Sequence, residues 1–308
     1  MCVSRHILRI PPMNRRTYFP LALAAMAAAS IGAWCAETVL FEGKSAFNQI
    51  WVTSDESGMR TLYFEKGGAR QSVVKPGDPD HLELPYVRAV LCSLVFCESP
   101  NRILVVGLGG GTIPMFLHKH FPKAGVDVVD IDPVVVQVAK RFFGFREDAR
   151  VKVHVADGRR FIEQSRTPYD WIILDAYGAD NIPAHLTTAE FLQSVRRTLS
   201  HRGVVAANLW ARHLNPQYDS MLRTYQEVFP EVAVIRVPGA GNRIVLALPY
   251  RDHFTLQELA KRAERITKQH GIRYDLAEYV RIGFEGVNQR DPGATVLRDS
   301  AMPPVQNR

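Results

Sequence analysis

Cysteine is scarce in this chain of 308 residues, which contains four. Cys2 and Cys35 lie in the first 36 residues, while Cys92 and Cys97 are five positions apart in a segment whose pattern predicts a helix. A helix turns that spacing onto different faces, so this pair fits neither a metal site nor a disulfide framework. The sequence therefore predicts no metal centre, and we expect Cys92 and Cys97 to be buried thiols.

Clusters of positive charge with interleaved aromatic residues are also missing. The formal net charge is +7, but residues 1–36 hold no acidic residue and supply four of these charges through Arg5, Arg9, Arg15 and Arg16, which leaves +3 for the remainder. A groove for nucleic acid needs a concentrated basic surface. We therefore expect no nucleic-acid partner.

The apolar runs are too short for an ordinary membrane span. The apolar run Tyr18–Trp34 is rich in alanine, carries no charge and follows a pair of arginines, which is the order of a basic n-region and an apolar h-region. The string NRRTYFPLALAAMAAA resembles a twin-arginine export signal. We expect residues 1–36 to be a targeting segment that directs export to the periplasm. A membrane anchor and a cytoplasmic location stay open, because neither Ala33 nor Ala36 ends an A-x-A cleavage pattern.

Residues 37–82 predict a small N-terminal β unit. Apolar residues recur at a period of two around Ile50, Val52, Leu62 and Phe64, with SDESG and KGG as turn signals between them. Such a stretch is too short to form the main domain, so we expect it to precede a larger one.

Residues 83–291 predict that larger domain, in which strand-like and helix-like segments alternate. Five runs rich in β-branched residues have the continuous apolar character of strands buried on both faces: 102–107, 126–132, 151–157, 169–175 and 203–210. Helical patterns separate them at 112–121, 133–143, 158–164 and 188–199, after an earlier one at 86–97. The fold class is therefore α/β, with a Rossmann-like parallel sheet, followed by a closing antiparallel hairpin (EVAVIRV and RIVLALP), an amphipathic helix at 255–270 and a disordered tail at 292–308.

Glycines and a carboxylate follow the first two strands of this sheet. The string GLGGGT contains Gly107, Gly109 and Gly111, and glycines let a backbone approach a ligand closely, while the helix N-terminus offers unpaired N–H groups. Asp130 ends the second strand, where a carboxylate accepts the ribose hydroxyls in nucleotide-binding domains. Asp132 is expected to cap the next helix instead. The combination of the glycine turn and Asp130 predicts a nucleoside site.

Two further strand ends carry carboxylates. Asp157 and Gly158 follow the third strand, where an acceptor can take the exocyclic amine of adenine; a simple helix cap is the alternative. Asp175 ends the fourth strand, at the sheet edge where the other groups would hold the nucleoside. We predict catalytic or substrate roles for Asp175 and for Asp180, five residues on, with loop shaping as the alternative for Asp180.

Five strings between residues 47 and 210 form a recognisable series: FNQI, VVGLGGGT, VDID, ADGRRF and YDWIILDAYGADNIPAHL. They resemble the strand motif Y-Q-x-I, the glycine loop, V-E-I-D, D-D-G-x-x-F and the long last motif of the spermidine synthase (polyamine aminopropyltransferase) family. The resemblance implies an S-adenosylmethionine-dependent methyltransferase-type sheet and a homodimer. It also implies aminopropyl transfer from decarboxylated S-adenosylmethionine to a small amine such as putrescine, without a metal.

The same resemblance assigns roles to individual residues. It makes Asp175 the base for the attacking amine and places Gln71 with the residues that bind the S-adenosyl co-substrate. Asn48, Tyr86 and Tyr177 fall on positions that contact the substrate.

Departures from the family pattern fall on the amine half of the site. Gly110 stands where the family's glycine loop has an aspartate for the amino end of the aminopropyl group, and Val87-Arg88 replace its His-Glu pair. Two alternatives therefore stay open. One is a methyltransferase-like enzyme that uses S-adenosylmethionine itself. The other is an exported protein that keeps the fold without catalysis, because S-adenosyl donors are made in the cytoplasm.

Overall fold

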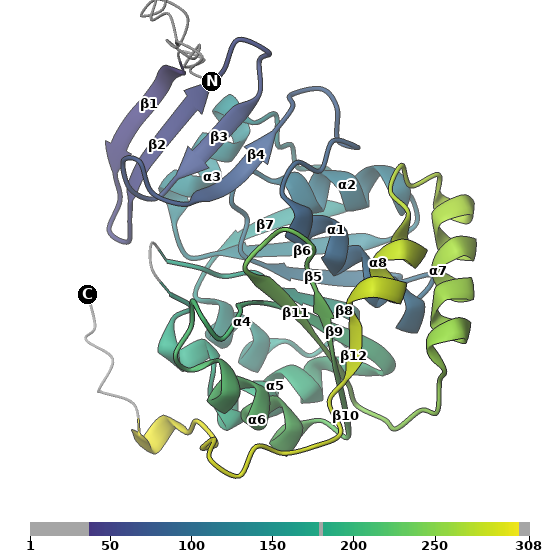
Figure 1. The fold of residues 1–308 in the computed structure, drawn as a ribbon. Coiled ribbons are helices and arrows are strands. Elements are labelled where there is room, and N and C mark those ends of the chain that lie inside the picture. Colours follow the sequence, from purple (N-terminus) through teal and green to yellow (C-terminus); the bar gives the residue numbers. More distant parts are fainter. Residues whose placement is uncertain (1–36, 179–180, 302–308) are drawn as a thin grey trace, which may run out of the picture. The chain divides into compact units, whose positions relative to one another are not determined.

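The small antiparallel unit predicted near the N-terminus is present in the computed structural model, which describes residues 37–178 and 181–301 (Figure 1). Its strands pair in the order of the chain: β1 (Thr38–Lys44), β2 (Gln49–Ser54), β3 (Arg60–Tyr63) and β4 (Arg70–Val74). Ile50, Val52 and Leu62 are fully buried and pack against Val135 and Val138. The period of two along the strands thus supplies one apolar face, which covers helix α3 (Pro133–Phe142).

The predicted parallel sheet is also confirmed. The order of its eight strands is β12-β10-β11-β9-β8-β5-β6-β7. Their bounds are β5 (Arg102–Val106), β6 (Gly125–Asp130), β7 (Val151–Val155), β8 (Tyr169–Leu174), β9 (Leu199–Trp210), β10 (Glu231–Arg236), β11 (Asn242–Leu248) and β12 (Phe284–Gly286). Strands β5 to β9 pair in parallel, whereas β9, β11, β10 and β12 pair antiparallel. The chain leaves β5 toward β6 and returns later to β8 on its other side, which creates a crevice at the carboxyl ends of these strands.

Helices cover both faces of this sheet, as Figure 1 shows, with α7 and α8 on one side and α5 and α6 on the other. The remaining helical bounds are α1 (Pro85–Leu91), α2 (Thr112–His120), α4 (Gly158–Gln164), α5 (Ala189–Thr198), α6 (Tyr218–Val228), α7 (Leu256–His270) and α8 (Leu276–Gly283), with short 3-10 turns η1 (Cys92–Phe96), η2 (Ala184–Leu186) and η3 (Asp299–Ala301). Within residues 37–178 and 181–301, no helix combines the length and the apolar character needed to cross a membrane.

Four elements differ from the sequence expectation. The helix predicted over residues 86–97 changes at Cys92 into a 3-10 turn, and α6, α8 and β12 had no counterpart in the pattern. Cys92 is buried as expected, which raises the pKa of its thiol, whereas Cys97 is half-buried and its pKa rises to about 12 by burial.

The C-terminal segment also differs from the expected disordered tail. Residues 292–301 lie against α5 and α6: the Ala189 N–H donates to the Leu297 carbonyl at 2.8 Å, and the Leu297 N–H donates to Thr224 Oγ1 at 2.9 Å. Val296 and Leu297 pack against the core on this face, which gives the segment apolar burial as well. The predicted targeting segment (residues 1–36), Asp180 and residues 302–308 lie outside the described residues.

Candidate functional site

A cavity of about 420 Å³ lies at the carboxyl ends of β5, β6, β7 and β8, between the central sheet, strand β4 and helix α1. Its wall includes most of the residues that the sequence singled out: Asn48, Gln71, Tyr86, Gly107, Gly109, Asp130, Asp157, Gly158, Asp175 and Tyr177. The strand ends converge because parallel strands present their carboxyl ends at one sheet edge. Gly111 was predicted to belong to this set but is absent from the wall.

The glycine loop is shaped by packing as well as by access to a ligand. Gly107 has a φ of +103°, and a Cβ there would lie 2.2 Å from the carbonyl oxygen of Asp175. That carbonyl is fixed because the Asp175 N–H donates to the Val106 carbonyl at 2.8 Å, where β8 ends beside β5. A side chain at position 107 would therefore collide with the backbone of the candidate base.

Gly110 and Gly111 are the last two residues of this loop before α2. Gly111 precedes α2 with a φ of +82°, so it starts the helix rather than lining the cavity. The Gly110 N–H donates to Ser72 Oγ at 2.9 Å, and a Cβ at Gly110 would lie 3.1 Å from the Cβ of Ser72 and 3.0 Å from the ring of Phe143. The space that an acidic side chain would need at position 110 is thus filled by β4 and by the residue after α3.

Asp130 lies at the end of β6 on the cavity wall, where the sequence predicts a carboxylate for the ribose. Its Oδ2 accepts the Leu108 N–H at 2.8 Å and its Oδ1 accepts the Asp132 N–H at 2.9 Å, which hold the carboxylate over the glycine loop. Burial raises the pKa of Asp130 against these hydrogen bonds. Asp132 caps α3, as predicted, since its Oδ1 accepts the Val134 N–H at 2.9 Å.

Both expected roles of Asp157 are compatible with its position. Its Oδ1 caps α4 by accepting the Arg160 N–H at 2.9 Å, and its Oδ2 lies 2.8 Å from Nε2 of His185. The imidazole of His185 is the main cause that lowers the pKa of Asp157. His185, on the loop after β8, is a wall residue that the sequence reasoning missed, because nothing in a loop sequence shows which strand end it returns to.

The C-terminal segment is connected to the backbone of His185 through Arg159. Arg159 donates to both carboxylate oxygens of Asp299, at 2.7 and 2.6 Å, and to the backbone carbonyl of His185 at 3.3 Å. Asp299 lies in η3, so the contact joins the end of the chain to the outer side of the cavity wall.

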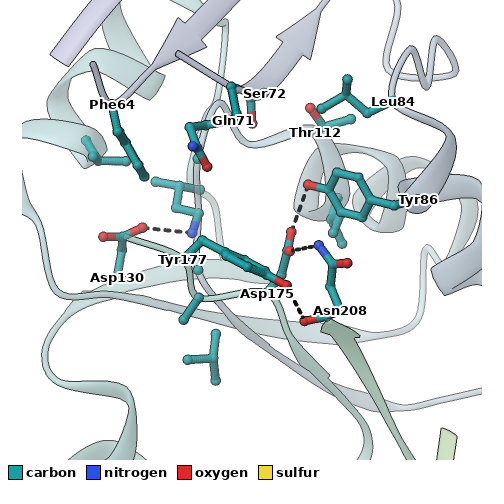
Figure 2. A pocket seen from close by; sticks show the side chains of 18 of the residues that line it. Phe64, Gln71, Ser72, Leu84, Tyr86, Thr112, Asp130, Asp175, Tyr177 and Asn208 are labelled. Carbon is teal, nitrogen blue, oxygen red and sulfur yellow. Dashed lines mark hydrogen bonds between the residues drawn. The ribbon is translucent and has the colours of Figure 1, made fainter. Parts of the chain in front are cut away.

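Asp175 lies at the floor of the cavity with both oxygens engaged, as Figure 2 shows. Oδ2 accepts the Tyr86 hydroxyl at 3.0 Å, and Oδ1 accepts Nδ2 of Asn208 at 2.9 Å. Burial raises the pKa of Asp175 to about 6, while the Asn208 and Tyr86 hydrogen bonds lower it. A carboxylate with this pKa is ionised at neutral pH yet basic enough to accept a proton, which suits general-base catalysis.

Tyr177 lines the cavity with its ring, but its hydroxyl is already used. The hydroxyl donates to the backbone carbonyl of Asn208 at 2.9 Å, and the ring stacks on Trp210 with centroids 5.4 Å apart. Asn208 was missed by the sequence reasoning, although the run GVVAANLW places it near the end of a buried strand, the signal that identified the four other strand ends.

The part of the chain that the structure describes holds no group of three or more His, Cys, Asp or Glu side chains arranged for a metal ion. Asn48 and Gln71 reach the cavity from the N-terminal sheet. The site therefore combines a roof from that sheet with a floor from the central sheet.

The comparison with protein families agrees with the motifs. Residues 87–255 match the family of the spermine/spermidine synthase domain. The chain belongs to this family. One similar relative is the polyamine aminopropyltransferase of Vibrio vulnificus (strain CMCP6), which is 37% identical over 237 residues that cover 75% of this chain and 77% of the relative.

Solved structures give a second comparison. A probable spermidine synthase from Corynebacterium glutamicum ATCC 13032 has a TM-score of 0.67 over 87% of this chain and 99% of its own, at 23% identity, which supports the fold alone. Human methyltransferase-like protein 13 in complex with SAH is 32% identical, with a TM-score of 0.57 over 61% of this chain and 93% of that one. Proteins similar to this spermine/spermidine synthase family member thus include a methyltransferase-like protein.

Proposed function

We propose that this chain is a spermidine synthase-like aminopropyltransferase, which moves the aminopropyl group of decarboxylated S-adenosylmethionine to an amine such as putrescine. The observation that carries the proposal is the Asp175 carboxylate, which has a pKa of about 6 and lies at the floor of the predicted nucleoside cavity. The relative named polyamine aminopropyltransferase supports the same activity.

The proposed reaction is an in-line displacement at the carbon next to the sulfonium. The nitrogen lone pair of a neutral amine forms the new C–N bond while the C–S bond breaks, and its electron pair returns to sulfur to give 5′-methylthioadenosine. The attacking nitrogen loses one proton, which Asp175 accepts. Polyamines are protonated at neutral pH, so the site must also hold a cation, and the ionised carboxylate serves this purpose before the reaction. The positive sulfur activates the carbon, so no metal enters the proposal.

The donor half follows from the positions of the strand ends. We assign the ribose to Asp130 and the adenine to the wall formed by Asp157 and Gly158, with Gly107 and Gly109 beside the donor. Gln71 covers the donor from β4. One solved relative supports an S-adenosyl ligand: the human protein in complex with SAH.

Three further expectations stay proposals. Export through residues 1–36 rests on the arginine pair and the apolar run, with an anchor or a cytoplasmic location as alternatives. A homodimer rests on the family resemblance. The lack of a nucleic-acid partner rests on the dispersed positive charge.

A methyltransferase-like activity is the second candidate, and one contact favours it. Ser72 and Phe143 fill the space beside Gly110, so position 110 offers no carboxylate for the amino end of an aminopropyl group. The similarity to the human methyltransferase-like protein points in the same direction.

The test is a paired incubation of the purified protein with putrescine and either decarboxylated S-adenosylmethionine or S-adenosylmethionine. Release of 5′-methylthioadenosine from the first donor, lost in Asp175→Asn, supports aminopropyl transfer. Release of S-adenosylhomocysteine from the second donor supports methyl transfer instead. Neither product over a panel of amines, together with no calorimetric binding of 5′-methylthioadenosine, leaves a non-catalytic protein with this fold.

A further inference from the structure

Two asparagine side chains on the cavity wall continue the hydrogen bonds of Asp175 from one strand to the next. Asn208 lies near the end of β9 and is 4% exposed, and its Nδ2 donates to Asp175 Oδ1 at 2.9 Å. Asn242 opens the neighbouring strand β11, in register with Trp210, and its Nδ2 donates to Oδ1 of Asn208 at 2.9 Å. The reaction described above uses neither amide.

The order of these hydrogen bonds fixes the orientation of the Asn208 amide. A primary amide has one side that donates and one that accepts. Because Asn242 donates to the oxygen of Asn208, the NH₂ group of Asn208 faces Asp175. A flipped amide would set its oxygen against the carboxylate and its NH₂ group against another NH₂ group, and both hydrogen bonds would be lost.

We propose that Asn242 is a positioning residue that acts through Asn208 to keep Asp175 ionised and its carboxylate fixed in one orientation. The proposal rests on the function assigned to Asp175 above. Its physical basis is the response of the site to proton transfer. A protonated Asp175 becomes a hydrogen-bond donor, and an Asn208 amide that could rotate would turn its oxygen toward that proton and stabilise the acid form. Asn242 opposes this rotation as long as its own NH₂ group faces Asn208, so Asn208 remains a donor in both protonation states and favours loss of the proton.

The other groups that face Asp175 do not replace this contact. Tyr86 from α1 donates to Oδ2 of Asp175, the oxygen that Asn208 does not contact. Tyr177 from the loop after β8 donates to the backbone carbonyl of Asn208. Burial raises the pKa of both hydroxyls, so both tyrosines stay neutral over the working pH range. Asp130 and Asp157 are other carboxylates on the cavity wall, and the causes that shift the pKa of Asp175 are burial and the two hydrogen bonds alone.

The experiment compares the pH profiles of Asn242→Ala, Asn242→Asp and wild type, with Asn288→Ala as a control at an asparagine outside the cavity wall. Asn242→Ala releases the Asn208 amide. Asn242→Asp reverses it, because a carboxylate at position 242 accepts from the NH₂ group and turns the oxygen toward Asp175. We expect an upward shift of the acid limb by about one unit in Asn242→Ala, so that kcat/KM falls about fivefold at pH 6 and less than about threefold at pH 8.5. A larger shift is expected in Asn242→Asp.

A second measurement separates this proposal from the proposed function. Unfolding free energies of wild type, Asp175→Asn, Asn242→Ala and the double variant, followed from pH 4 to 9, report the protonation of Asp175 without any turnover. The contribution of Asp175 to the unfolding free energy changes around one pH midpoint. A higher midpoint in the Asn242→Ala background supports the positioning role of Asn242 even if the protein transfers no aminopropyl group. An unchanged midpoint, or a loss of kcat/KM that is equal at pH 6 and 8.5, overturns it.

Discussion

Replacing Asp175 by Asn should stabilise the fold at neutral pH while it abolishes aminopropyl transfer. Burial raises the pKa of this carboxyl from 3.8 to about 6, so the folded protein resists its ionisation more than the unfolded chain does. The stability that Asp175 contributes is therefore fully present below about pH 4 and is lost as the pH rises through about 6. The amide side chain of the Asp175→Asn variant does not ionise, and its oxygen can still accept from Asn208.

The size of the effect follows from the shift. One pKa unit corresponds to about 1.4 kcal/mol, and the rise from 3.8 to about 6 spans roughly two units, so the ionised carboxylate costs about 3 kcal/mol at pH 8. Most of this cost develops between pH 4 and 6. We expect the difference in unfolding free energy between Asp175→Asn and wild type to grow by roughly 2.5 kcal/mol between pH 4 and pH 8, because a small part of the cost is already present at pH 4.

Urea unfolding at several pH values measures this difference, and Asp148→Asn is a suitable contrast. The N–H of Val151 and the imidazole of His118 hold the pKa of Asp148 below its usual range, so its ionised form stabilises the fold above about pH 4. That variant should already be less stable than wild type at pH 4, and the difference should stay nearly constant up to pH 8, because its change with pH lies below pH 4, in contrast to Asp175→Asn. A difference for Asp175→Asn that is flat from pH 4 to 8 would refute the reasoning, because it would mean that the carboxylate ionises as easily in the fold as outside it.

Three further predictions concern neighbours of Asp175 and of Asp157, which belongs to the wall assigned to adenine. Tyr86→Phe removes the donor to Oδ2, so the pKa of Asp175 should rise and kcat/KM should fall about tenfold at pH 6 but recover by pH 9; a uniform loss would instead indicate a binding defect. Gly107→Ala should lower the unfolding free energy by more than about 2 kcal/mol, because its Cβ would meet the Asp175 carbonyl, and an unchanged urea midpoint would contradict this. His185→Ala removes the imidazole that orients the Asp157 carboxylate, so it should weaken calorimetric binding of 5′-methylthioadenosine about tenfold at pH 7, whereas unaltered affinity would show that His185 does not support the adenine site.

The central sheet could be predicted because its strands are continuous apolar runs rich in β-branched residues, and because parallel strands present their ends at one edge. This rule brought Asp130, Asp157 and Asp175 to one cavity. The same rule applied to the fifth run would have found Asn208, which lies near the end of β9. Asp132 followed local capping chemistry, which sequence shows well.

Features that depend on distant partners could not be predicted. The helix at Pro85 changes to a 3-10 turn at Cys92, and no local signal marks that position. The contact between Ser72 and Gly110 joins residues 38 positions apart, and Asn242 reaches Asn208 across 34. Each contact requires the register of the strands, which the periodicity of a single strand does not contain.

The contact of Arg159 with Asp299 links the C-terminal segment to the proposed nucleoside site. Asp299 is not a wall residue, yet through Arg159 it holds the backbone of His185, and His185 in turn contacts the Asp157 carboxylate. The last turn of the described chain, η3, thus supports a part of the cavity wall to which it contributes no residue. Substitutions in this segment would therefore change the affinity for a nucleoside, although none of its residues lines the cavity.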